Sequence, residues 1–213
     1  MNQILESLLV AVVLLDFFAL GGSRLRAVIR ATALQGAALA AMPIAMHGHA
    51  TTHLVLVGFG TLMVKGVTIP WLLNRALRDV TIRREVEPTI GFTTSLVLGA
   101  IGTGFGLAFA DSLPLADEHA GSLAVPASFA TMIAGFLILA TRRKAITQVV
   151  GYMILENGVF LFGLLLLEAQ PFLVEIGVLL DLLVGVFVMG ITMHRIQREF
   201  SNIDAASFTA LRE

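Results

Sequence analysis

The sequence predicts an all-α, polytopic membrane protein with seven transmembrane helices. Its 213 residues are 57% hydrophobic and only 14% charged, with a mean hydropathy of +0.89, whereas soluble domains carry about 45–50% apolar and about 25% charged residues. The apolar residues form runs of about 17–25 residues, the length of helix that crosses a hydrocarbon core about 30 Å thick. Such runs are predicted to be helices because backbone amides inside a bilayer must be satisfied within their own segment, and the alternation typical of a barrel is absent.

Seven such runs follow one another along the chain. They cover residues 3–20, 27–46, 52–73, 89–110, 123–141, 146–167 and 172–193. The first follows an acidic rather than a basic start, so it is predicted to be a retained helix and not a cleaved signal peptide. The polar stretch at 74–88 separates the first three spans from the others. We therefore divide the chain into a three-helix segment (1–88), a fourth helix with an outer loop (89–122) and a three-helix segment with a tail (123–213).

The positions of the basic residues predict the orientation of these spans. Thirteen of the 14 Lys and Arg residues lie after the first, third, fifth and seventh runs, and the other connections, HGHATTH, DSLPLADEHAGS and EAQP, contain none. The positive-inside rule places the N-terminus outside and the C-terminus in the cytoplasm. We expect a multi-pass protein of the cytoplasmic (inner) membrane, whose surroundings are the lipid bilayer. Because the basic residues are segregated into these connections, no nucleic-acid partner is expected.

Asp16, Lys65, Glu156 and Asp181 lie within the first, third, sixth and seventh apolar runs. A charge at the bilayer centre costs roughly 2.5–3.5 kcal/mol, so such residues usually face a protein interior or a wet path. At a rise of about 1.5 Å per residue from the cytoplasmic side, Lys65, Glu156 and Asp181 lie about 13, 15 and 18 Å deep, and Asp16 only about 7 Å. Three groups sharing one layer near the midplane predict a proton relay.

Glycines surround the two deeper acids. Gly177 and Gly185 lie one turn either side of Asp181, and the sixth run holds further glycines at positions 151, 158 and 163 around Glu156. Small residues allow helices to approach closely. We expect the last two helices to pack together with both carboxyl groups in one pocket.

A purely structural role for the buried charges is the alternative. An ion pair of Lys65 with Asp16 or Asp181 would fix the register of the helices, as buried pairs do in some proteins. Asp16 is expected near an interface within reach of water, as are Glu6 and Glu175, which favours a structural role for these three acids.

No catalytic residue, metal site or bound cofactor is predicted in this chain. It has no cysteine, so it offers no ligands for an iron–sulfur cluster, a thiolate zinc site or a disulfide. His47, His49 and His53 are interpreted as loop histidines. The glycine-rich run 99–106 has no strand before it, so we interpret it as a helix-packing surface in which Gly102 and Gly106 lie one turn apart.

The sixth run and the end of the chain carry a family resemblance. The segments RRKAITQVVGYMILENGVFLFG and HRIQREFSNID are the residues on which it depends. Over its length the chain resembles component E of hydrogenase-4, a membrane subunit of formate hydrogenlyase-type complexes. Its last three spans are similar to the K subunit of respiratory complex I and to the C subunit of multisubunit cation/proton antiporters.

The resemblance implies where a proton path would run. The matched positions are Arg142 with Arg143, Gly151, Glu156 with Asn157, Asp181, His194 with Arg195, and 202–204. It assigns Glu156 and Asp181 to a lateral proton path, although the family's glutamate aligns with Met153, three residues earlier, and its second acid is a Glu. Lys65 would tune or extend that path. Asp16, Asn157 and Glu175 are secondary candidates.

Two kinds of function therefore stay open at this stage. The first is a non-catalytic membrane subunit of a complex I-like, proton-translocating hydrogenase, beside antiporter-like subunits and a quinone-site-like anchor subunit, with nickel–iron and iron–sulfur centres only in partner subunits. Its variant is an assembly subunit without a conducting role. The second is a free-standing seven-helix receptor or light-driven pump, which the position of Lys65 in the third rather than the seventh run disfavours.

Overall fold

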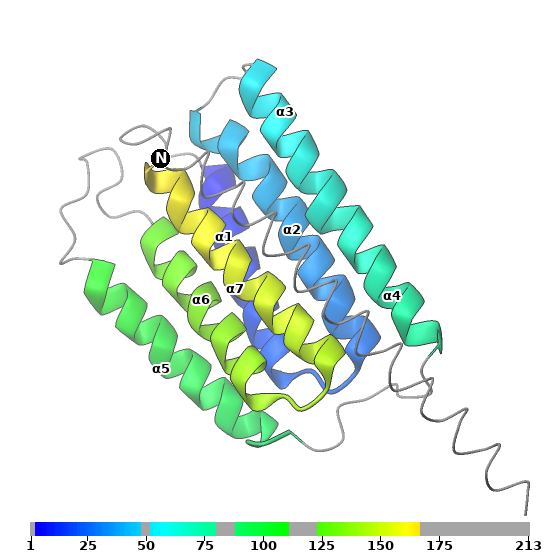
Figure 1. The fold of residues 1–213 in the computed structure, drawn as a ribbon. Helices are drawn as coiled ribbons and strands as arrows, with labels where there is room; N and C mark the ends of the chain where they lie inside the picture. The colour runs from blue at the N-terminus through cyan, green and yellow to red at the C-terminus, as the bar shows by residue number, and fades with distance from the viewer. Residues whose placement is uncertain (1–2, 48–51, 80–87, 111–122, 167–213) are drawn as a thin grey trace, which may run out of the picture. The chain divides into compact units, whose positions relative to one another are not determined.

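The regular elements of the protein are helices throughout the part that the structure describes (Figure 1). The computed structural model describes residues 3–47, 52–79, 88–110 and 123–166. Five helices there are long and apolar enough to cross a membrane. They are α1 (Gln3–Gly21), α2 (Leu25–His47), α5 (Phe92–Ala110), α6 (Ala124–Thr141) and α7 (Ala145–Leu166). The all-helical class is confirmed; the run at 172–193, with Asp181 and Glu175, lies outside the described residues.

The third predicted run forms three consecutive helical pieces: α3 (Thr52–Thr61), the π-helix η1 (Leu62–Thr68) and α4 (Ile69–Asp79). Figure 1 shows α3 and α4 following one line. The predicted end at residue 73 was too early. Helix α4 continues because Leu73 and Leu77 are both buried against the protein, while the guanidinium of Arg75 lies 5.6 Å from the ring centre of Trp71 on the outer face.

The π-helix has an identifiable cause in Pro70. A proline inside a helix has no N–H to donate, and its ring clashes with the carbonyl four residues earlier, here that of Gly66. The chain widens at this point: the N–H of Ile69 bonds to the carbonyl of Val64, five residues back. The hydroxyl of Thr68 donates to the carbonyl of Met63, also five residues back, at 2.7 Å. Such wide turns are often found at functional sites.

The end of α1, the start of α5 and the end of α6 are joined to one another around Arg142. The N–H of Thr89 donates to the carbonyl of Thr141 at 2.9 Å, which joins the start of α5 to the end of α6. Arg142 donates from Nη2 to the carbonyl of Leu20 at 2.7 Å, near the end of α1. It also packs over the ring of Phe92 at 4.5 Å. Arg142 is thus buried, rather than exposed as expected of a residue in a cytoplasmic connection, because it supplies donors to carbonyl groups at helix ends.

Glycines set the close contact between α6 and α7. A Cβ atom added at Gly151 would lie 2.5 Å from the backbone nitrogen of Leu139, and one at Gly158 would lie 2.6 Å from that of Met132. Gly135 of α6 faces the backbone of Leu155 in the same way. Gly151 and Gly158 are thus close-approach positions toward the fifth predicted run; the expected packing of the last two runs involves residues outside those described. At Gly163 an added Cβ meets no described atom within 4 Å.

Glycines of α5 face α6 in a similar manner. An added Cβ at Gly102 would lie 2.6 Å from Ile133, and one at Gly106 would lie 3.0 Å from Phe129. The interpretation of the run 99–106 as a packing surface is confirmed.

One apolar core joins helices from both halves of the sequence. Its buried members come from α1, α2, α6 and α7. They are Leu5, Leu9, Val12, Leu39, Met42, Ala124, Val125, Ala127, Leu161 and Leu164. Polar side chains on the inward faces of these four helices are therefore enclosed by the protein.

We expect Gly151→Ala to destabilise the protein by about 1–3 kcal/mol, because the added methyl group meets the backbone of α6, which cannot move aside as a side chain can. The melting temperature in detergent would measure the effect. Gly104→Ala is the matched control, since a Cβ at Gly104 meets nothing within 4 Å. Equal melting temperatures for the two variants would contradict this account of the interface.

The predicted orientation can be tested by cysteine labelling, because the chain has no native cysteine. Ser122→Cys is expected to react with an impermeant maleimide added outside the cell. Ser23→Cys and Ser201→Cys are expected to react only after permeabilisation. Labelling of Ser201→Cys from outside, with Ser23→Cys still protected, would contradict the seventh span.

Candidate functional site: a buried polar network

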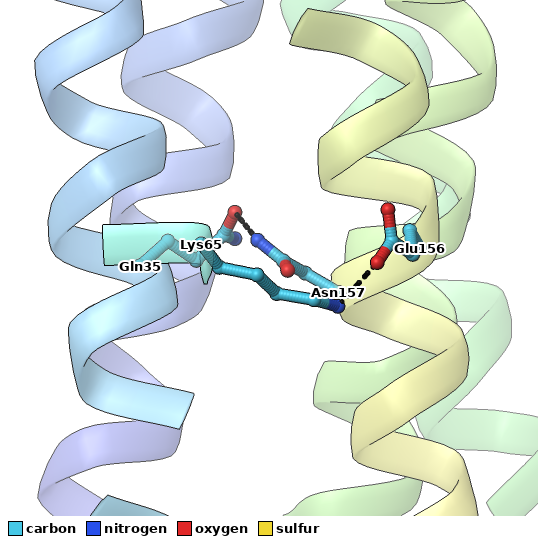
Figure 2. A network of polar contacts seen from close by, with 4 residues as sticks. All are labelled: Gln35, Lys65, Glu156 and Asn157. Atoms are coloured by element: carbon cyan, nitrogen blue, oxygen red, sulfur yellow. Dashed lines mark hydrogen bonds and ion pairs between the residues drawn. The ribbon is translucent and has the colours of Figure 1, made fainter. Parts of the chain in front are cut away.

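An ion pair joins the third predicted span to the sixth. The Nζ atom of Lys65 in η1 lies 2.7 Å from Oε1 of Glu156 in α7, and the two side chains are only 11% and 10% exposed. Figure 2 shows the Lys65 side chain extended across the space between its helix and α7. The ammonium group also lies 5.2 Å from the ring centre of Phe160, one turn from Glu156, in a cation–π contact. The pair is thus a desolvated interaction between two helices.

The backbone around Lys65 is held close to α2. A Cβ atom added at Gly36 would lie 2.9 Å from the Cβ of Lys65 and 3.0 Å from its carbonyl carbon. Any larger residue at position 36 would push η1 away from α2. Gly36 and the π-helix together therefore set where the long Lys65 side chain starts.

A second carboxyl group, that of Asp16 in α1, lies in the same region and is only 2% exposed. Gln35 of α2 donates from Nε2 to Oδ1 of Asp16 at 2.7 Å. The Thr131 hydroxyl of α6 lies 2.7 Å from Oδ2. Each oxygen of the carboxyl group thus has one partner, as expected for a buried polar group.

Asn157 is next to one carboxyl group in sequence and bonds to a partner of the other. It follows Glu156 in α7, and its Nδ2 atom donates to Oε1 of Gln35 at 3.1 Å (Figure 2). The side-chain oxygen of Asn157, Oδ1, is buried and accepts no hydrogen bond from the described residues. We call Asp16, Gln35, Lys65, Thr131, Glu156 and Asn157 the polar network; it draws on α1, α2, η1, α6 and α7.

The structure brings together three of the four ionisable residues singled out in the apolar runs. The structural alternative named Asp16 or Asp181 as the partner of Lys65. Within the described residues, Lys65 pairs with Glu156 instead. The expectation that Asp16 reaches water near an interface was wrong. Depth along α1 does not give exposure here, because Gln35 of α2 and Thr131 of α6 enclose the carboxyl group of Asp16.

Sequence reasoning missed Gln35 and Thr131, and it missed the structural role of Arg142. Gln35 had a usable signal, since a side-chain amide in the middle of an apolar run needs a hydrogen-bonding partner there. Thr131 had none, because threonine in a membrane helix commonly bonds to its own backbone. Thr131 does so as well, with Oγ1 lying 2.8 Å from the carbonyl of Ala127.

The network offers groups that can bind protons. Within the described ranges, no three His, Asp or Glu side chains are grouped so as to hold a metal ion. Two carboxyl groups and one amine lie among amide and hydroxyl groups, where a change of charge at one member changes the field at the next. Asp181 and Glu175 fall outside the described residues.

Comparison with known proteins identifies a close set of relatives. The chain is 35% identical over 195 residues to the uncharacterized protein Rv0085 of Mycobacterium tuberculosis, covering 89% of this chain and 87% of that protein. The chain belongs to the same family as this mycobacterial protein. No family model matches the sequence, and no solved structure matches it.

A second relative has a described role. The chain is 34% identical over 100 residues to the hydrogenase-4 component E of Escherichia coli K12, and equally to that of Shigella flexneri. The match spans 47% of this chain and 45% of the hydrogenase protein. The relationship to component E is thus shown for about half of each chain.

We expect Lys65→Met alone to destabilise the protein by about 3–5 kcal/mol, because it leaves the Glu156 carboxylate buried without its partner. The double variant Lys65→Met with Glu156→Met should recover most of that loss, since it removes both charges. Thermal unfolding of the single and double variants in detergent would measure the coupling between the two positions. Additive losses would show that the pair contributes no coupling.

Proposed function

We propose that this protein is a non-catalytic membrane subunit of a proton-translocating, hydrogenase-type complex, and that its polar network forms part of a lateral proton path. The similarity to hydrogenase-4 component E supports the kind of complex. The observation that supports the path is the ion pair of Lys65 with Glu156, buried among apolar helices at 2.7 Å. Ionisable groups at such positions in membrane proteins usually serve ion or proton movement.

Glu156 and Lys65 would act as a pair that opens when a proton arrives. Protonation of Glu156 neutralises the carboxylate and removes most of the attraction that holds Lys65. The freed ammonium group would then affect the next ionisable group in the path, which by the resemblance described above is Asp181. Glu175 would be a further acid near the outer end. The proton would thus pass along the layer of the pair and not directly across the membrane.

The partners follow from the same proposal. An antiporter-like subunit on one side and a quinone-site-like anchor subunit on the other would extend the path, in the cytoplasmic membrane. Electron transfer would depend on nickel–iron and iron–sulfur centres in other subunits, since this chain has no cysteine to bind a cluster.

A structural role is the second candidate, and one observation favours it. Lys65 and Asp16 both have polar partners, and the network connects five helical elements. A hydrogen-bonded network of this kind fixes helix register without conducting anything. On this reading the chain is an assembly subunit of the same complex.

The two candidates differ in what Glu156→Gln does. We expect the complex with this substitution to assemble with its full set of subunits, to keep its electron-transfer activity and to lose most of its proton translocation in membrane vesicles. Glu6→Gln is the matched control, because Glu6 lies in the first turn of α1 and outside the network. Asp181→Asn should behave as Glu156→Gln does.

The outcomes separate the candidates. Loss of subunits from the purified complex would support the assembly role. Normal assembly with unchanged proton translocation would remove Glu156 from the mechanism.

A further inference from the structure

Asp16 takes part in none of the ion pairs of the described residues. Its partners are an amide and a hydroxyl group, both neutral. A buried carboxylate without a cation is costly, and such a group commonly becomes protonated instead. The arrangement around Asp16 must therefore be compared for both of its protonation states.

The Thr131 hydroxyl can serve either state. Its oxygen lies 2.7 Å from Oδ2 of Asp16 and 2.8 Å from the carbonyl oxygen of Ala127. A hydroxyl group has one proton and two lone pairs, so it can donate to only one of these two acceptors at a time. If Asp16 is ionised, Thr131 donates to it. If Asp16 carries a proton on Oδ2, Asp16 donates to Thr131, and Thr131 donates to Ala127.

The other oxygen of Asp16 needs no rearrangement. Gln35 donates to Oδ1 at 2.7 Å, and Oδ1 remains an acceptor in both states when the proton is on Oδ2. Gln35 is itself held by Asn157 at 3.1 Å. The only movement needed is therefore rotation of one hydroxyl proton, and no buried partner of Asp16 loses its hydrogen bond in either state.

We propose that Asp16 is a second, reversible proton-binding site, in which the Thr131 hydroxyl turns between Asp16 and the Ala127 carbonyl as the proton binds and leaves. Binding forms one O–H bond at Oδ2 with a proton taken from water, and release returns the proton to water. The inference deepens the proposed function, on which the use of this proton in translocation rests. Proton binding itself is measurable without the rest of the complex's chemistry.

The charged groups around this site come from few elements. Helices α5 and α6 contribute no charged side chain between their described ends. The arginines of α2 at positions 26 and 30 are exposed. Arg142 binds the carbonyl of Leu20, one turn beyond Asp16 on α1, and Lys65 with Glu156 lies beyond Gln35 and Asn157. A change of charge on this pair would therefore shift the pH at which Asp16 binds its proton.

Infrared difference spectroscopy of the purified full chain in detergent tests this site. We expect acidification to produce a carboxylic C=O stretching band that Asp16→Asn removes and that returns to baseline when the pH is raised. Glu6→Gln is the control that should leave the band in place. Absence of any band assignable to Asp16 across the pH range in which the protein stays folded would overturn the proposal. So would a band that does not change with pH.

A second pair of variants keeps the test independent of the folding of Asp16→Asn. Thr131→Val removes the hydroxyl, so the acid proton loses its acceptor and the C=O band should move to higher frequency. Thr131→Ser keeps the hydroxyl and should restore the wild-type band. Identical spectra for Val and Ser at this position would overturn the role of Thr131. Failure of Glu156→Gln to affect translocation, with the Asp16 band intact, would instead count against the proposed function alone.

Discussion

The charge of Lys65 is the constraint on which the arrangement of the described helices depends. An ammonium group in an apolar bundle needs a counter-charge, and Glu156 supplies it at 2.7 Å. That contact requires η1 and α7 to pack against the same helix, α2. Gly36 makes this possible, because it lets the backbone at Lys65 lie against α2. The glycines of α6 and α7 then bring Thr131 and Asn157 into the same region. The close packing at these glycines is thus what allows the polar side chains to reach their partners.

Much of the fold could be predicted from the sequence, because apolar run length alone determines where membrane helices lie. The runs corresponding to α1, α2, α5, α6 and α7 are within a few residues of the observed helices. The π-helix was not predicted, although Pro70 is visible in the sequence and a proline clashes with the carbonyl four residues earlier, here that of Gly66. The extension of α4 to Asp79 was missed because Leu77 lies in a stretch whose charges indicated a loop.

The sequence predicted which ionisable residues belong to the polar network better than it predicted which of them contact one another. Lys65, Glu156 and Asp16 were found because charges in apolar runs are rare, but their partners depend on helix rotation, which the sequence pattern does not define when helices are apolar on all sides. Depth along a helix was a poor guide for Asp16. The carboxyl group is enclosed by Gln35 of α2 and Thr131 of α6, and Thr131 is more than a hundred positions away in sequence.

Stabilisation and proton movement make different demands on such a network. A group that is satisfied in one geometry only can brace the helices, whereas a group that conducts needs a second arrangement of nearly equal free energy. The proposed proton site at Asp16 offers such a second arrangement, because Thr131 has two acceptors within hydrogen-bonding distance. Lys65 is held by Glu156 and by Phe160, and its long side chain starts from a widened helical turn. In the proposed function, the same residues would hold the helices together at rest and rearrange when a proton arrives.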